Sequence, residues 1–155
     1  TQEPLPLTVC TRLAKSFEAG MGHLYLLYGS EKMIGYITLG SNDLDSAKQF
    51  YDAFFSVLGI KRLPGSEQFP SWGIDWSSPP ALNIVNPYDK NEATVGNGVM
   101  VALKVETKEL VDKAHHKAIE LGAKCEGPPG PRGKSGFYAG YFRDLDGNKL
   151  NVFSF

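Results

Sequence analysis

An internal repeat, which begins at residue 33 and runs to the C-terminus, restricts this chain to a small set of folds. Each half opens with an alternating apolar run, IGYITLG in the first half and GVMVALKV in the second, and each run leads into a segment of helical periodicity. The halves are in register, because Tyr36 and Met100 are 64 positions apart (100 − 36), as are Asp43 and Thr107 (107 − 43). Two copies of a supersecondary unit are too few for a solenoid, so we expect one domain of two modules.

The helical segment of each half has an apolar stripe and a cap at both ends. Asn42 or Asp43 can cap the first helix and Gly59 can end it, while Thr107 and Gly122 take these places in the second. The predicted stripes are Ala47, Phe50, Tyr51, Phe54 and Leu58 in the first helix, and Leu110, Val111, Ala114, Ala118 and Leu121 in the second.

Three strand-like segments follow each helix, around IKRLP, FPSWGIDW and ALNIVN in the first half and around AKCE, FYAGYFRD and NKLNVFSF in the second. The closing segments, ALNIV at 81–85 and KLNVF at 149–153, are alike, and a turn signal precedes each. The order strand, helix and three strands, found twice, predicts an α+β fold in which one helix covers one face of each mixed sheet. The opposite face is left free.

We expect the binding site on that free face. Alternation along the opening and closing strands places one residue of each strand there: Tyr36, Asn83, Met100 and Asn151. The phenol and the two amides can orient a polar ligand, or they can bond one another and trapped water in a half-buried sheet. The methionine can contact an apolar ligand or fill the core.

Several aromatic residues are further candidates for the site. Strand alternation predicts that Trp72 and Trp76 lie on the same side, where they can wall a pocket for a planar or apolar ligand. Phe137, Tyr138 and Tyr141 near the last hairpin have the same two interpretations. All five can instead pack in the core or in a dimer interface.

Other polar groups are assigned to structure. His115 and His116 are adjacent on a helix and point about 100° apart, so we expect them on the solvated surface rather than on one metal ion. The Pro/Gly-rich stretch 127–136, which carries basic residues, is a connector or else a basic lid over an anionic ligand. The turn RDLDGN at 143–148 is assigned to folding.

Composition excludes several classes of protein. A net charge of −1 over 155 residues favours neither nucleic acid nor an anionic membrane as a partner, and two cysteines are too few for a disulfide framework. The sequence has no apolar run near the roughly 20 residues that cross a bilayer, and no secretion signal, so we expect a cytoplasmic protein. Residues 1–32 are expected to form an N-terminal extension before a single domain at 33–155, with modules at about 33–90 and 96–155.

The runs MIGYITLGSNDLDSAKQFYDAFFSVLG, GNGVMVAL and GFYAGYFRDLDGNKLNVF resemble the vicinal oxygen chelate superfamily. This group includes glyoxalase I, extradiol dioxygenases, fosfomycin-resistance transferases and bleomycin-resistance proteins. The resemblance covers residues 33–155, and FRDLDGNKL is its most specific part. It implies two βαβββ modules that form a cup around a ligand. It also implies a homodimer, since members often build the cup across two chains.

Many members hold a divalent metal through a histidine on the first strand and a carboxylate or glutamine on the last strand of each module. The matching positions here are Tyr36, Met100, Asn83 and Asn151, and none has the expected residue type. A phenol with an ordinary pKa of about 10, a thioether and two neutral amides bring no charge to balance a divalent cation. We therefore predict no metal at these positions and no cofactor.

The residues and the resemblance together predict a metal-independent protein that binds a small molecule and possesses no recognisable catalytic residue. The ligand is expected to be aromatic or amphipathic, and the resemblance to the bleomycin-resistance proteins implies that the protein sequesters it without converting it. Two alternatives stay open. One is a metal-dependent lyase, isomerase or dioxygenase that holds its metal through other residues, and the other is a structural or partner-binding protein whose cup is filled.

Overall fold

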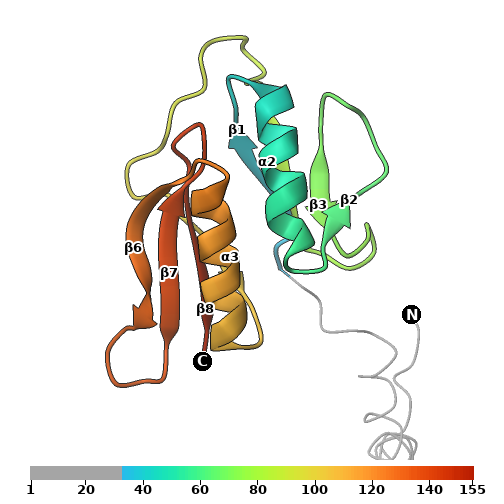
Figure 1. The fold of residues 1–155 in the computed structure, drawn as a ribbon. Helices are drawn as coiled ribbons and strands as arrows, with labels where there is room; N and C mark the ends of the chain where they lie inside the picture. The colour runs from blue at the N-terminus through green and yellow to red at the C-terminus, as the bar shows by residue number, and fades with distance from the viewer. Residues whose placement is uncertain (1–32) are drawn as a thin grey trace, which may run out of the picture. The chain divides into compact units, whose positions relative to one another are not determined.

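Each half of the repeat folds as a strand, a helix and three strands, which confirms the predicted α+β class (Figure 1). The computed structural model describes residues 33–155, and the expectation for residues 1–32 lies outside this part of the chain. The first module consists of β1 (Tyr36–Gly40), α2 (Leu44–Ser56), β2 (Lys61–Arg62), β3 (Ser71–Gly73) and β4 (Ala81–Val85). The second consists of β5 (Val101–Lys104), α3 (Lys108–Glu120), β6 (Lys124–Pro131), β7 (Tyr138–Arg143) and β8 (Lys149–Ser154).

Each module forms its own four-stranded mixed sheet, with the order β1-β4-β3-β2 in the first and β5-β8-β7-β6 in the second. The opening strand pairs in parallel with the closing strand, and the other pairs are antiparallel. The opening strands β1 and β5 are therefore edge strands of their sheets, and each leaves one row of backbone groups free for a further strand.

Local capping explains where the helices begin and end. The Asp43 carboxylate accepts the Ser46 N–H at 3.0 Å, and the Thr107 hydroxyl accepts the Leu110 N–H at 3.3 Å. Gly59 and Gly122, just beyond the helices, have φ values of 70° and 100°. This left-handed conformation favours glycine and ends both helices where the sequence predicts.

One hydrophobic core joins the two modules. It contains side chains of both helices and of both sheets, and the rings of Phe54 on α2 and Phe142 on β7 lie 5.4 Å apart. Both rings are fully buried, and burial of a phenylalanine side chain stabilises a fold by about 2 kcal/mol. None of the helices in the described part of the chain is long and apolar enough to cross a lipid bilayer.

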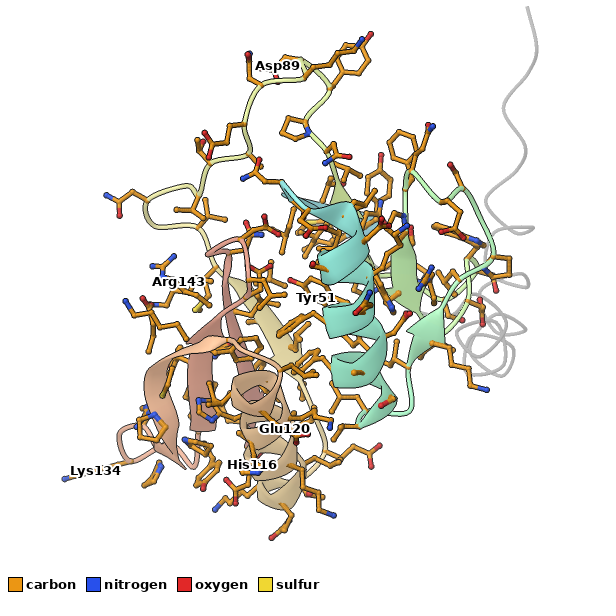
Figure 2. All side chains as sticks on the ribbon, turned by 45° about the horizontal axis from the view of Figure 1, so that its top comes forward. Tyr51, Asp89, His116, Glu120, Lys134 and Arg143 are labelled. Carbon is orange, nitrogen blue, oxygen red and sulfur yellow. The ribbon has the colours of Figure 1, made fainter. Side chains whose placement is uncertain are left out.

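A buried hydrogen-bond network also joins the modules. The hydroxyl of Tyr51, which is labelled on α2 in Figure 2, donates to the Asp144 carboxylate at 2.7 Å, and Asp144 accepts the backbone N–H groups of Asp146 and Asn148. The Asn148 amide donates to Asp144 and to the Gly40 carbonyl at the end of β1. The turn at 143–148 is thus structural, as the sequence predicts.

The Pro/Gly-rich stretch 127–136 differs from its prediction as a connector. Its first part belongs to β6, which runs to Pro131 and pairs with β7 through two shifts of register. A strand can include prolines here because β6 is at the edge of its sheet, where the missing N–H groups cost no ladder bond.

Candidate functional site

The side of the first sheet away from α2 has the polar residues that the sequence predicts. Thr38 is in register with Asn83, and Asn83 with Ser71, so these three side chains share one face. Tyr36 lies on the same face of β1 and is 65% exposed. We refer to this side of each sheet, away from its helix, as the open face.

The open face of the second sheet repeats this arrangement. Asn151 on β8 is in register with Ala102 on β5 and with Tyr141 on β7. Met100 precedes β5 by one residue and is 42% exposed. Tyr36 and Met100 therefore take equivalent positions, two residues before the partner of each asparagine. Each sheet carries one pair of the four predicted residues.

The two asparagines share an unusual property. The Oδ1 atoms of Asn83 and Asn151 are buried, and neither accepts a hydrogen bond from any group in the described part of the chain. An orphaned buried acceptor costs about 1–3 kcal/mol. Both orphans lie at matching positions of the two modules, so this cost is incurred twice at the place where the sequence predicts ligand contacts. A donor from outside the described residues would relieve it.

A group of cations surrounds Tyr141 on the second open face. The Arg132 guanidinium lies 5.4 Å from the centroid of the Tyr141 ring, and the Lys149 ammonium lies 5.8 Å from it. Arg143, labelled in Figure 2, donates to the Glu126 carboxylate at 2.6 Å, and Lys149 lies 3.1 Å from the same carboxylate. These two cations hold the pKa of Glu126 below its usual value, mainly through the Arg143 hydrogen bond.

Aromatic rings gather at the other end of this face. Phe153 is two residues beyond Asn151 on β8, and its ring lies 5.1 Å from that of Phe137 and 5.9 Å from that of Phe155. Phe155 is 72% exposed. Phe137 is among the residues that the sequence predicts for the site, whereas Phe153, Phe155 and Lys149 are not. The alternation of β8 that places Asn151 on this face also places Lys149 and Phe153 there.

The expected position of Trp72 is wrong. Trp72 is in register with Leu82, faces α2 and is almost fully buried, and its indole N–H donates to Asp52 at 2.9 Å. Trp76 does not share a strand with it, because β3 ends at Gly73 and alternation cannot be carried across the turn. Trp76 is exposed, and its indole donates to the Pro64 carbonyl. Trp72 is a core residue, whereas Trp76 remains a candidate.

The expectation for His115 is also wrong, because this side chain is buried. A Cβ at Gly140 would lie 2.9 Å from the His115 ring, so the glycine makes room for the imidazole. The His115 Nε2 lies 3.2 Å from the Tyr141 carbonyl, which can only accept, so this nitrogen carries the proton. The Cys125 thiol lies 3.5 Å from the same nitrogen, and burial lowers the pKa of His115. His116 is exposed, as predicted.

A cavity of about 710 Å³ lies beside α3 and β6, on the helix-covered side of the second sheet. Its lining residues include Asp112, Lys113, His115, His116, Ile119, Cys125 and Pro129. It is therefore separate from the open face and from all four predicted ligand positions.

The donor set does not fit a divalent metal. Tyr36, Asn83, Met100 and Asn151 offer no carboxylate and no imidazole, and the orphaned amide oxygens bring no charge. Within residues 33–155, no three His, Cys, Asp or Glu side chains form a group that could hold a metal ion.

Comparisons with known proteins agree with this architecture. The sequence model of the Glyoxalase/Bleomycin resistance protein/Dioxygenase superfamily matches residues 33–152. The chain is similar to the crystal structure of a glyoxalase/bleomycin resistance protein from Albidiferax ferrireducens T118, with 33% identity and a TM-score of 0.71 over 80% of this chain and 99% of that one.

Two further solved structures have the same fold. A hypothetical protein from S. aureus is 26% identical, with a TM-score of 0.61 over 85% of this chain and 99% of that one. A lactoylglutathione lyase from Agrobacterium tumefaciens is 20% identical, with a TM-score of 0.56 over 81% of this chain and 95% of that one, and shows the fold alone. No curated protein matches the sequence.

Proposed function

Because this chain belongs to the Glyoxalase/Bleomycin resistance protein/Dioxygenase superfamily, we propose that it binds a small organic molecule on its open sheet faces. The observation that carries the proposal is the pair of orphaned acceptors, the Oδ1 atoms of Asn83 and Asn151. A ligand that donates hydrogen bonds at these positions would recover a cost that the folded chain alone incurs. Tyr36 and Met100 would supply a hydroxyl and an apolar contact beside them.

The proposed binding does not depend on a metal at these four positions. A divalent cation that gives up its hydration shell is held by anionic or strongly basic ligands. The side chains of Tyr36, Asn83, Met100 and Asn151 provide neither. Lewis-acid polarisation of a substrate oxygen therefore has no support from these residues. Sequestration of a compound without conversion is the function that this donor set favours.

We further propose that a second copy of the chain completes the cup. The edge strands β1 and β5 have free ladder groups, and exposed apolar side chains lie next to them in the sequence: Ile34, Val99 and Met100. Apolar exposure next to an unpaired strand edge is typical of an interface. A cytoplasmic location, expected from the sequence, stays a prediction.

Two measurements test the proposal. The melting temperature of the purified protein, recorded across a panel of aromatic and amphipathic compounds, should rise with at least one of them, because a ligand of the native state stabilises it by mass action. Elemental analysis should find no stoichiometric zinc, nickel, iron or manganese. One tightly held metal per chain, with activity lost on chelation, would support a lyase or dioxygenase instead. A panel without any shift would support a filled cup.

A further inference from the structure

The open face of the second sheet has a polar end and an apolar end. Lys149, Asn151 and Phe153 alternate along β8 and point to the same side. Because residues i and i+2 of a strand are about 6.8 Å apart, Lys149 and Phe153 are separated by about 14 Å along the strand. The orphaned Oδ1 of Asn151 lies between them.

The polar end has an excess of positive charge. Arg132, Arg143 and Lys149 contribute three cations, and Glu126, which contacts the last two, is the anion among them. Arg132 takes part in no ion pair within residues 33–155, and its guanidinium donates to the Pro128 carbonyl at 2.7 Å. A guanidinium presents several donors in one plane, so donors remain available for a second acceptor.

The apolar end consists of Phe153, Phe137 and Phe155, whose ring centroids lie within 6 Å of one another. Phe155 exposes most of its side chain to water. A ring cluster that is covered on one side only can bind an apolar group on the other, which removes apolar surface of both from water.

We infer that the ligand is an amphipathic anion, with its negative head group at Arg132 and Lys149 and its apolar body directed toward Phe153 and Phe155. A hydroxyl or amide group between the two ends would donate to the Oδ1 atom of Asn151. This inference rests on the proposed function and names the class of compound. An anionic head neutralises part of the excess charge beside Tyr141, whereas a cationic head meets Arg132 and Lys149 at close range. A small anion without a body leaves the aromatic end exposed.

The test uses three compounds with the same ten-carbon chain. Decanoate, decyltrimethylammonium and decanol are titrated into the full-length protein below their aggregation limits, with acetate as the head group alone, and heats of binding are measured. We expect decanoate to bind at least about tenfold more tightly than the cation and the alcohol, and acetate to show no binding in the same range. Higher salt should weaken decanoate binding.

Variants locate the two ends. Arg132→Gln and Lys149→Gln should each weaken decanoate by about tenfold and leave decanol unchanged, because a half-buried contact between charges is lost. Lys117→Gln on α3 is the matched control. Phe155→Ala should weaken decanoate and decanol alike by about fivefold, and Tyr88→Ala, which truncates another exposed ring, should not. Circular dichroism and melting temperature verify the fold of each variant.

The outcomes separate the two proposals. Equal affinity for decanoate and decyltrimethylammonium, or decanoate binding that Arg132→Gln and Lys149→Gln leave unchanged, overturns the inference and leaves the proposed function standing. Absence of decanoate binding also overturns the inference. If the wider panel of compounds gives no shift in melting temperature either, the proposed function fails with it.

Discussion

At the scale of single residues, alternation predicts which face of the sheet a side chain occupies only within one continuous strand. It placed Tyr36 and Asn151 on the open face, because β1 and β8 are five and six residues long. It failed for Trp72, because β3 has three residues and ends before Trp76. The apolar stripe of α3 does not reveal that His115 is buried, because the space for its imidazole comes from Gly140 on β7.

Tyr36→Phe tests the role of one hydroxyl. If this group contacts the ligand, its loss should weaken binding by about 1 kcal/mol, or roughly fivefold in Kd. Tyr88→Phe, at an exposed position in the loop before β5, is the control. Titration calorimetry with the compound of strongest thermal shift measures both. Equal affinities of wild type and Tyr36→Phe would remove Tyr36 from the site.

Tyr51→Phe tests the buried hydrogen bond between the modules. Its hydroxyl bonds a buried carboxylate, so the variant should lower the free energy of unfolding by about 2 kcal/mol in a urea titration. Tyr138→Phe is the matched control, because its hydroxyl bonds Asp112 at an exposed site and should contribute less than about 1 kcal/mol. Equal losses in the two variants would contradict a special role for the buried bond.

At the scale of elements, the helices and the closing strands could be predicted because their signals are local: periodicity, an N-cap and a glycine stop. The extent of β6 could not. A run such as KCEGPPGP is typical of a loop, and its pairing depends on β7, which the chain reaches only later. This segment can be a strand despite its prolines because β6 lies at the edge of the sheet. That position depends on the order of the strands and cannot be inferred from the segment itself.

We expect the attachment of α2 to β2 and β3 to depend on pH. Asp52 accepts hydrogen bonds from Arg62 on β2 and Trp72 on β3, and these bonds, chiefly the one from Arg62, lower the pKa of its carboxyl below 3.8. A carboxyl with a lowered pKa contributes stability above the unfolded value, and this contribution is lost as the pH falls through the folded value.

Asp52→Asn should therefore be less stable than the wild type at pH 7, and the difference should shrink as the pH falls below 3.8. Urea titrations at several pH values between 7 and 2.5 measure it. A difference that stays constant over this range would show that the charge of Asp52 is not what attaches α2 to β2 and β3.

At the scale of the whole molecule, the two modules share a core but keep separate sheets with free edges at β1 and β5. The repeat in the sequence predicted the modules, because each carries its own periodic signals. The separation of the two open faces was not predictable from those signals. Tyr36 and Asn83 belong to the first module, and Met100 and Asn151 to the second. The proposed cup needs a second chain so that the open face of one sheet can meet an open face of the partner.

Ile34→Glu tests this assembly. A carboxylate at this exposed position beside β1 should disfavour burial of the edge and shift the protein from dimer to monomer in sedimentation equilibrium, at micromolar concentration. Tyr88→Glu is the control. If the second copy completes the site, ligand affinity should fall together with the dimer. A wild type that sediments as a monomer at all concentrations would contradict the proposal.

Because the two halves share a core, the residues that face the core are more constrained than those on the open faces. A half expressed alone would expose Phe54 or Phe142 to solvent and lose the Tyr51–Asp144 bond, so neither is expected to be a viable fragment. The seam between the halves thus tolerates little variation. On the open faces the two halves share an asparagine, Asn83 or Asn151, but differ beside it, where Tyr36 in one half has Met100 as its counterpart in the other. The freedom to acquire new specificity resides on those faces.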